Sequence, residues 1–407
     1  MDPLAYLFSL EQFGIKFGLD NITAIVERLG RPDRAYRTIH VAGTNGKGSV
    51  TAMVDAALRA AGHRSARYTS PHLVNLAERF VIAGAPVSHD ELVAAAADVR
   101  TVVESLRADG TLSTQPTFFE VTTAIGFELF RRARVDVAVL EVGLGGRLDA
   151  TNVVAPIATA ITSIAFDHER YLGSTLADIA AEKAGIVKPR VPVVIGELPD
   201  EARSVIDRVA RERAAPVVVA DRTDVGGLAI GLRGQHQVIN AAIAVRLLEV
   251  ADAAGIRVPR GAIAAGVKTP QWPGRLDERR LADGRELLLD AAHNPAGAAA
   301  LASYLNDDAI KRPLVFAAMR DKDIDGMLRA LLPAIDALIV ARPSTARAEE
   351  PARIVERARA IAPSMDVVAA ASLDAALADA WSRSPRIVVA GSIFLLGDVM
   401  RRLGLHL

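Results

Sequence analysis

The chain has 407 residues, of which 51% are hydrophobic and 24% charged, a composition typical of a folded globular protein. Lysine and arginine together number 48, as do aspartate and glutamate, so the formal net charge is +0 and gives no basic footprint for nucleic acid or an anionic membrane. The absence of cysteine excludes disulfides, a thiolate nucleophile and a zinc–cysteine site.

The sequence also argues against export and membrane insertion. The N-terminal stretch Met1–Ser9 lacks the basic segment of a signal peptide. Apolar runs such as Val153–Phe166 are interrupted by polar residues and are too short to span a bilayer. We therefore expect a cytoplasmic protein. We also expect a monomer whose partners are small molecules. The length favours two domains.

A glycine- and lysine-containing motif, weak by its residues alone, follows a mostly helical stretch over residues 1–38. A strand-like run, Ile39–Ala42, ends in Gly43-Thr-Asn-Gly-Lys-Gly-Ser49, and a helical segment over Val50–Ala61 comes next. Such a strand, glycine-rich turn and helix aim backbone N–H groups at one point, where Lys47 adds a positive charge. The spacing departs from the Walker rule, and an ordinary tight turn is the alternative. The strand–turn–helix context favours a nucleotide phosphate site.

Further elements alternate up to residue 135. Ser70 precedes a proline, which disfavours a helix there and predicts a loop. The expected order is a short strand over Ser65–Thr69, the loop Ser70-Pro-His-Leu73, a helix over His89–Arg107, a surface loop over 109–117, and a helix over Val121–Arg132 that Thr117-Phe-Phe-Glu120 opens.

Three apolar runs then predict buried strands that end in polar residues. Continuous apolar strands with helices between them indicate a doubly wound α/β domain with a parallel sheet. Ligands of such sheets bind beyond the carboxyl ends of the strands, so Glu141 and His168 are expected beside the phosphate loop. The runs are Val135–Leu140 before Glu141, Ile157–Phe166 before Asp167-His168, and Val191–Ile195 before Gly196-Glu197.

A proline-glycine break at Gln271-Trp-Pro-Gly-Arg275 marks the expected domain boundary. We predict a central domain over residues 1–270 and a smaller, Rossmann-like α/β domain over 271–407. The strands expected in the second domain are Glu286–Leu289, Pro313–Met319, Ala337–Val340 and Arg386–Ala390.

Several polar residues at these positions could carry chemistry. Glu141 suits a magnesium ligand, with an N-capping or solvated acid as the alternative. His168 is equally consistent with a ligand and with a structural histidine. Lys183 lies in the last turn of a helix that Thr175 opens and Gly185 ends, where a lysine usually complements the helix dipole on the surface. In the second domain, Asp290-Ala-Ala-His293 suggests a polar site of unspecified ligand.

An ordered set of motifs resembles the folylpolyglutamate synthase/dihydrofolate synthase family of Mur-type ligases, from about Phe17 to the C-terminus. Each motif alone is modest, but the set is specific. It comprises Gly43–Ser49, Ser70-Pro-His-Leu73, Glu141-Val-Gly-Leu-Gly-Gly-Arg-Leu-Asp-Ala-Thr-Asn152, Asp167-His168, Glu182-Lys-Ala-Gly185, Pro273-Gly-Arg275 and Asp290-Ala-Ala-His-Asn-Pro295.

The resemblance implies roles for these residues. Lys47, Glu141, His168 and Lys183 would serve catalysis. Ser70, Glu141, His168 and Lys183, the last as a CO₂-derived carbamate, would hold two Mg²⁺ ions, which reverses the surface interpretation of Lys183. Contacts to ATP would come from Thr44, Asn45, Gly46, Lys47, Gly48, Ser49 and Asn240, and from Arg275 and Asp290 in the second domain. The pterin substrate would meet the neighbourhood of Ile15 with Phe17 and Gly18, and also Thr117, Phe118, Phe119, Glu120, Leu148, Asp149 and Ala150.

Two motif positions stand apart from these assignments. His293 matches a conspicuous position of the family without an assigned role. Relatives often carry arginine where this chain has Asn21, which puts the details of pterin or carboxylate binding in question.

The implied activity is an ATP-dependent acid–amino-acid ligase that adds L-glutamate to folates and to dihydropteroate through an acyl phosphate. The protein would supply positioning and charge neutralisation rather than a covalent nucleophile. Domain closure would assemble the ATP site and exclude water. Alternatives are folylpolyglutamate synthesis alone, a sibling Mur-type ligase for another carboxylate, and a nucleotide-binding regulator. The Ser70–Leu73 loop and Thr117–Glu120 argue against the sibling, and Glu141, His168 and Lys183 together argue against the regulator.

Overall fold

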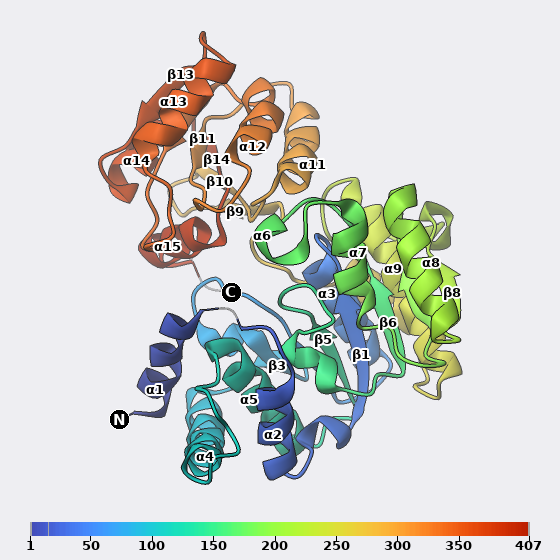
Figure 1. Ribbon diagram of the computed structural model, residues 1–407. Helices are drawn as coiled ribbons and strands as arrows, with labels where there is room; N and C mark the ends of the chain where they lie inside the picture. The colour runs from blue at the N-terminus through green and yellow to red at the C-terminus, as the bar shows by residue number, and fades with distance from the viewer. Residues whose placement is uncertain (1, 15, 406–407) are drawn as a thin grey trace. The chain divides into compact units, whose positions relative to one another are not determined.

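A computed structural model describes residues 2–14 and 16–405 of the chain. Ile15, expected near the substrate contacts, lies outside these residues. Contacts between Cα atoms divide the chain into two compact units, each an α/β structure (Figure 1). The first unit comprises Met1–Ile164, Ser174–Gly231 and Ile239–Pro270, and the second comprises Ala165–Gly173, Leu232–Val238 and Gln271–Leu407.

The described part of the first unit contains an eight-stranded sheet in the order β4-β3-β2-β5-β1-β6-β7-β8. The neighbours from β2 to β8 in this order pair in parallel, whereas β3 and β4 are antiparallel, so the expected doubly wound parallel sheet is confirmed. The strands are β1 (Arg37–Ala42), β2 (Ser65–Tyr68), β3 (Phe80–Ile82), β4 (Ala85–Pro86), β5 (Val137–Glu141), β6 (Ala158–Ile161), β7 (Val193–Ile195) and β8 (Val217–Val219).

Register places the ends of the central strands at one edge of this sheet. On β1, Val41 pairs with Glu141 of β5, and Ala42 pairs with Ile161 of β6. The carboxyl ends of β1, β5 and β6 are therefore level. Glu141 lies at the edge where the glycine-rich turn leaves β1, as the apolar runs predicted.

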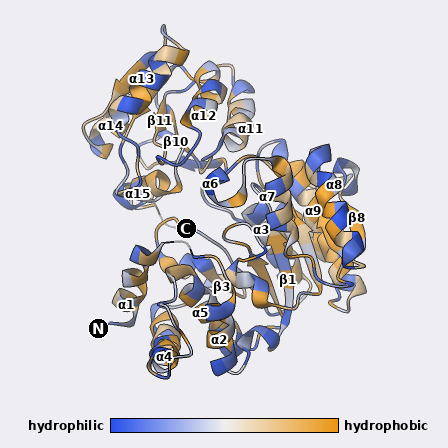
Figure 2. Cartoon of the chain, in the orientation of Figure 1, coloured by the Kyte–Doolittle hydropathy of each residue, from blue (hydrophilic) through white to orange (hydrophobic). Residues whose placement is uncertain are grey.

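Helices carry the remainder of the first unit. On α8, the buried residues Ala202 and Ile206 are four positions apart, which is the period of one helix face, and Figure 2 shows apolar and polar residues on this helix. The helices are α1 (Pro3–Ser9), α2 (Asp20–Arg28), α3 (Lys47–Ala60), α4 (His89–Ala108), α5 (Phe118–Arg132), α7 (Leu176–Ala184), α8 (Asp200–Glu212), α9 (His236–Ala253), whose first residues belong to the second unit, and α10 (Arg260–Lys268), with 3₁₀ turns η1 (Leu10–Phe13), η2 (Pro32–Arg34), η3 (Leu76–Arg79), η4 (Ala150–Val153) and η5 (Arg222–Val225).

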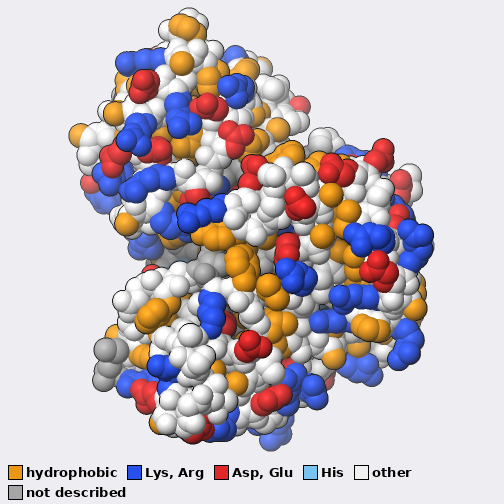
Figure 3. Space-filling view, in the orientation of Figure 1, with side chains coloured by type: hydrophobic (Ala, Val, Ile, Leu, Met, Phe, Trp, Pro, Cys, Tyr) orange, Lys and Arg blue, Asp and Glu red, His pale blue; other side chains and the backbone are white. Residues whose placement is uncertain are grey.

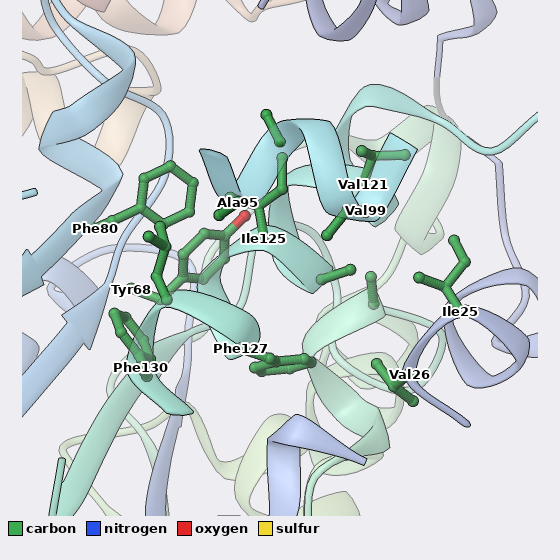
Figure 4. Packing of buried hydrophobic residues seen from close by; sticks show 14 of the residues in the cluster. Ile25, Val26, Tyr68, Phe80, Ala95, Val99, Val121, Ile125, Phe127 and Phe130 are labelled. Atoms are coloured by element: carbon green, nitrogen blue, oxygen red, sulfur yellow. The ribbon is translucent and has the colours of Figure 1, made fainter. Parts of the chain in front are cut away.

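One apolar core of this unit lies where α2, α4 and α5 meet β2, β3 and β5 (Figure 4). Tyr68 and Phe80 place their ring centroids 5.7 Å apart on neighbouring strands. Phe127 and Phe130 enter the same cluster from α5, and Val99 enters it from α4. Burying aromatic side chains of this size stabilises the helix–sheet contact by roughly 1.5–3 kcal/mol each.

The sequence prediction is wrong about the length of one strand. β6 ends at Ile161 and does not continue to Phe166, because the hydroxyls of Thr162 and Ser163 donate hydrogen bonds to the glycine-rich turn after β1. The helix after that turn also differs, since α3 begins at Lys47 and not at Val50. His168 consequently follows an irregular segment of the second unit and does not directly end a strand.

The described residues of the second unit contain a six-stranded sheet in the order β13-β12-β11-β14-β10-β9. All neighbouring pairs are parallel except β9 with β10, and the four predicted strands are present, although the one expected over Pro313–Met319 spans only Leu314–Phe316. The elements are β9 (Asp277–Arg280), β10 (Glu286–Asp290), β11 (Leu314–Phe316), β12 (Ala337–Val340), β13 (Asp366–Ala369) and β14 (Arg386–Ala390), with α6 (Glu169–Leu172), α11 (Pro295–Asn306), α12 (Ile324–Leu331), η6 (Leu332–Ala334), α13 (Pro351–Ile361), α14 (Leu373–Arg383) and α15 (Ile393–Leu403).

The surface carries charges of both signs. On the face that Figure 3 shows, Lys and Arg side chains are interspersed with Asp and Glu, in keeping with the formal net charge of +0. Among the described helices, none combines the length and the apolar character needed to cross a membrane.

Candidate active site

The glycine-rich turn after β1 adopts a backbone that requires glycine. Gly46 is the N-cap of α3 with φ +87°, and a Cβ there would lie 2.3 Å from Asn240 Oδ1. Gly43 has φ +149°, and a Cβ there would lie 1.9 Å from Thr162 Oγ1. The turn is thus closely packed on its inner side, and it leads into the N-terminus of α3, where backbone N–H groups favour an anion.

Residues just beyond β6 fix the turn. The N–H of Thr44 donates to the carbonyl of Ser163 at 2.8 Å, and the N–H of Asn45 donates to Ser163 Oγ at 2.9 Å. Thr162 Oγ1 donates to the carbonyl of Asn45 at 2.6 Å. Lys47 Nζ donates to the carbonyls of Gly43 and Thr44 at 2.9 and 3.1 Å, so its ammonium lies beside the turn itself.

Two predicted magnesium ligands of the first unit lie together. Glu141 ends β5, and its Oε2 accepts a hydrogen bond from the N–H of Ser70 at 3.1 Å. Ser70 follows β2, the neighbour of β5 in the sheet. A buried carboxylate is thereby positioned at the carboxyl edge of the sheet, where oxygen ligands suit a hard divalent cation.

Lys183 is buried, and the interpretation of it as an exposed residue is wrong. Its side chain belongs to α7, and the residue is 4% exposed. This helix docks onto the loop after Glu141, because the N–H of Arg147 donates to the carbonyl of Glu182 at 2.8 Å and Asn152 Nδ2 donates to the carbonyl of Gly185 at 3.2 Å. The sequence missed the burial because a lysine in a last turn is most often solvent-exposed.

The predicted pterin contacts at the start of α5 form a capping box. Glu120 Oε2 accepts from the N–H of Thr117 at 2.7 Å and from its hydroxyl at 2.9 Å, and Thr117 Oγ1 accepts from the N–H of Glu120. Asn21 is buried and donates to the same Glu120 oxygen at 3.4 Å. The Asn21 amide therefore faces this cap.

Aromatic residues lie beside the capping box. Phe118 stacks on Phe8 with ring centroids 6.0 Å apart, and the guanidinium of Arg79 lies 5.2 Å from the Phe118 centroid. Arg79 also donates to Nδ1 of His72 in the Ser70–Leu73 loop at 3.0 Å. Phe17, in the same unit, is 42% exposed.

Asp149 is buried and uses both carboxylate oxygens within the protein. Oδ2 accepts from the N–H groups of Gly143 and Leu144 at 3.0 and 2.9 Å. Oδ1 accepts from the N–H and hydroxyl of Thr151 at 3.0 and 2.5 Å. Burial raises the pKa of Asp149, and these four hydrogen bonds oppose the rise. Leu148 is partly exposed and Ala150 is buried.

In the second unit, two predicted ATP contacts lie near each other. Asp290 ends β10 and accepts from the N–H groups of Leu276 and Ala292 at 2.8 and 2.9 Å. Burial raises the pKa of Asp290, although the positive charge of Arg275 opposes the shift. The motif residue Asn294 caps α11 through Oδ1, which accepts from the N–H of Gly297.

The Asp167 carboxylate contacts three polar side chains of the second unit. Its Oδ1 lies 2.5 Å from Lys322 Nζ, and its Oδ2 accepts from Asn294 Nδ2 at 3.1 Å and lies 3.5 Å from His293 Nε2. Burial opposes ionisation of Asp167, but the hydrogen bond from His293 and the charge of Lys322 outweigh it, so its pKa lies well below the ordinary value. The sequence analysis gave no role to Asn294, although it lies in the Asp290–Pro295 motif, and it did not single out Lys322, which follows a predicted strand.

His168 faces the same ammonium. Its backbone is left-handed, with φ +52°, and its N–H donates to Asp167 Oδ1 at 2.8 Å. The ring Nε2 lies 3.2 Å from Lys322 Nζ, and it must accept because an ammonium has only donors. Burial lowers the pKa of His168 to about 4, which keeps the ring neutral. Its lone pair is therefore turned toward a cation.

The two units match two models of one protein class. Residues 41–224 match the Mur ligase middle domain, and residues 274–393 match the Mur ligase, glutamate ligase domain. The chain is thus a Mur-type ligase. A dihydrofolate synthase/folylpolyglutamate synthase of Mycobacterium tuberculosis is 37% identical over 434 residues, which cover 93% of this chain and 88% of the relative. The chain belongs to the folylpolyglutamate synthase/dihydrofolate synthase family and is an ATP-dependent ligase.

Solved structures of the family superimpose on nearly the whole chain. Mycobacterium tuberculosis folylpolyglutamate synthase complexed with ADP has a TM-score of 0.90 and 34% identity, covering 99% of each chain. A bifunctional folylpolyglutamate synthase/dihydrofolate synthase with Mn, AMPPNP and L-glutamate bound has a TM-score of 0.86 and 30% identity, covering 99% of this chain and 98% of that one.

Proposed function

We propose that this enzyme adds L-glutamate both to reduced folates and to dihydropteroate. In the first step a carboxylate oxygen of the acceptor attacks the γ-phosphorus of ATP, ADP departs, and an acyl phosphate forms. In the second step the α-amino nitrogen of L-glutamate attacks the acyl carbon, phosphate departs with the bonding electrons, and the nitrogen loses a proton to give the amide. The chain supplies binding, orientation and charge neutralisation.

One observation carries the proposal. A glycine-requiring turn at a helix N-terminus and a buried carboxylate, Glu141, lie at the same sheet edge of a chain that a dihydrofolate synthase/folylpolyglutamate synthase matches over 93% of its length. Phosphates on Thr44–Ser49 and a divalent cation on Glu141 would occupy adjacent positions, as transfer of a phosphoryl group requires. Lys47 would then exchange its loop carbonyls for phosphate oxygens.

The donor set of the first unit suits magnesium. Glu141 offers a carboxylate oxygen, and the neighbouring Ser70 adds a hydroxyl. His168 of the second unit already turns a neutral ring nitrogen to a cation, the Lys322 ammonium. The metal would neutralise charge on the transferred phosphoryl group. Within the first unit, the oxygen donors of Glu141 and Ser70 support a hard divalent ion.

We also propose that Lys183 carries a carbamate. The neutral amine is the species that reacts with CO₂, and burial in general disfavours the charged form of a lysine. Docking of α7 onto the loop after Glu141 supports a role beside that carboxylate. A carbamate would turn a cationic position into an anionic oxygen donor for the second magnesium ion.

The acceptor would be held by the residues around α5. Phe17, Phe118 and Phe119 offer aromatic faces for a pterin ring, and Thr117 and Glu120 are fixed by their capping box. Asn240 would join the ATP contacts, since it lies against Gly46. Arg275 and Asp290 are the proposed ATP contacts of the second unit.

Release of ADP distinguishes the alternatives. The purified enzyme is incubated with ATP, Mg²⁺ and L-glutamate, with dihydropteroate or tetrahydrofolate as acceptor. Turnover with both acceptors supports the proposal. Turnover with tetrahydrofolate alone reduces it to folylpolyglutamate synthesis. Nucleotide binding without release of ADP for either acceptor would overturn it.

A further inference from the structure

A buried polar chain leads from the central strand β1 to the proposed acceptor site. His40, two residues before the end of β1, is fully buried, and its Nε2 lies 2.8 Å from Thr151 Oγ1. The Thr151 hydroxyl lies 2.5 Å from Asp149 Oδ1. Asp149 holds the N–H groups of Gly143 and Leu144 through its other oxygen. Three consecutive links therefore connect the sheet interior with an outer turn.

That turn lies against a residue of the proposed acceptor site. A Cβ on Gly143 would lie 2.4 Å from Cζ of Phe119, so the Phe119 ring packs directly on the turn. Gly143 is exposed and Leu144 is partly exposed, whereas His40, Thr151 and Asp149 are buried. The buried chain thus supports the turn from inside and leaves its outer surface for a ligand.

The available protons determine which residue donates at each hydrogen bond between His40, Thr151 and Asp149. Asp149 already receives three backbone N–H groups, so as a carboxylate it accepts the Thr151 proton as well. The Thr151 oxygen then has a lone pair for the proton on His40 Nε2. Nδ1 of His40 has no hydrogen-bond partner among the described residues. If His40 donates to Thr151 and Thr151 donates to Asp149, Nδ1 of His40 carries a lone pair and no proton. A buried lone pair without a donor is more common than a buried N–H group without an acceptor.

We propose that His40 and Thr151 are positioning residues for the acceptor site. They hold Asp149, and through it the Gly143–Leu144 turn and the Phe119 ring, in the geometry that receives the pterin. This inference rests on the proposed function. It assigns no contact with the substrate to either residue, since both are buried behind the turn.

The test compares variants that break each link with variants that keep it. Thr151→Val removes the hydroxyl, and Thr151→Ser retains it. His40→Leu removes the donor, and His40→Gln can place an amide N–H near the position of Nε2. As a matched control, Thr159→Val removes another buried hydroxyl of the same sheet, which bonds to the carbonyl of Pro192 at 3.2 Å.

The measured quantities are the KM for the folate acceptor, the KM for ATP and the melting temperature. Thr151→Val and His40→Leu are expected to raise the acceptor KM about tenfold, the size of one lost buried hydrogen bond, and to leave the ATP KM within about twofold. Thr151→Ser and His40→Gln should recover most of the loss, and Thr159→Val should change neither constant. Equal increases in both constants, or a lower melting temperature with the acceptor KM unchanged, would overturn the positioning role.

A measurement on the unmodified protein keeps the inference testable if a variant does not fold. Ring ¹⁵N NMR of histidine-labelled enzyme, with His40 assigned by its loss in His40→Gln, should place the proton on Nε2. A proton on Nδ1 would overturn the chain as drawn. A wild-type enzyme that shows the Nε2 proton but does not glutamylate either acceptor would instead reject the proposed function.

Discussion

Lys322 Nζ lies 2.5 Å from Asp167 Oδ1, and the two side chains are only 6% and 7% exposed. The residues are 155 positions apart in sequence, yet both belong to the second unit. Without the ammonium, the Asp167 carboxylate would keep its hydrogen bonds from Asn294 Nδ2 and the His168 N–H but would lose the positive charge that offsets its desolvation.

The first prediction concerns this pair. Lys322→Met should lower the free energy of unfolding of the second unit by about 3 kcal/mol, because it leaves the Asp167 carboxylate buried without its cation. The double variant Lys322→Met/Asp167→Asn should regain part of that loss. Urea unfolding followed by tryptophan fluorescence measures it, since both tryptophans, Trp272 and Trp381, belong to this unit.

Lys311→Met is the control, because Lys311 is an exposed lysine of the same unit. Its effect on unfolding should stay within about 0.5 kcal/mol. A double variant that is no more stable than Lys322→Met would mean that the two charges are not coupled.

The second prediction concerns the phosphate-type loop. Lys47→Ala should reduce ligase turnover by about a hundredfold, since it removes a positive charge from the group that is transferred. The melting temperature should change little, because the Lys47 hydrogen bonds to Gly43 and Thr44 are replaceable by water at a partly exposed site. Lys268→Ala, at an exposed helix end, is the matched control. Turnover of Lys47→Ala within about tenfold of wild type would be too small an effect for phosphate contact.

The third prediction concerns Lys183. Removing CO₂ from the assay should lower activity of the wild-type enzyme, and bicarbonate should restore it. Lys183→Ala should lose ligase activity, with partial recovery in acetate, since a small carboxylate can replace the missing oxygen donor. Mass spectrometry under native conditions, or a crystal structure with nucleotide and magnesium, should detect one added carboxylate. A fully active alanine variant with an unmodified lysine in the wild type would reject the carbamate.

The fourth prediction is a pH dependence of stability that arises from His40. Burial lowers the pKa of His40 to about 3, with a smaller contribution from the charge of Lys188. In the unfolded chain the same ring titrates near 6.5, so between these values only the unfolded state takes up the proton. Stability therefore falls as the pH decreases through this window, by about 1.4 kcal/mol per pH unit.

Unfolding in urea at pH 7 and pH 5 isolates this contribution. The wild type should lose about 2 kcal/mol more than His40→Gln between these pH values, which is the charge uptake of one histidine over this interval. Equal losses in both proteins would mean that His40 is protonated in the native state.

The fold was predictable where residue pattern and chain direction were sufficient. The apolar runs before Glu141 and Asp290 predicted parallel strands, and in each sheet they predicted the edge at which the carboxylate lies. Short or charged strands were missed, such as β9, because Asp277–Arg280 is polar and is held by pairing with β10 rather than by burial. Such pairing depends on a partner strand that the local sequence does not reveal.

The candidate site was likewise predictable from local motifs, but not where a residue depends on a partner that is distant in sequence. The order of the motifs pointed to Ser70 and Glu141, and in the structure the backbone N–H of Ser70 donates to Glu141 Oε2 at 3.1 Å. It did not identify Lys322, which is distant in sequence from its partner Asp167 and acquires its meaning only through burial. Nor did it relate His40 to Asp149, because a lone histidine in an apolar strand is typical of a core residue.

The path of the backbone limits how this protein can be divided. Before residue 271 the chain contributes two short segments, Ala165–Gly173 and Leu232–Val238, to the second unit. A fragment of residues 271–407 would therefore lack Asp167, and the Lys322 ammonium would have no carboxylate partner there. The complementary fragment would contain His168 without Lys322. A split version suited to reassembly should be cut inside one unit, for example at the exposed residues 109–111 after α4, and not at the junction that sequence patterning suggests.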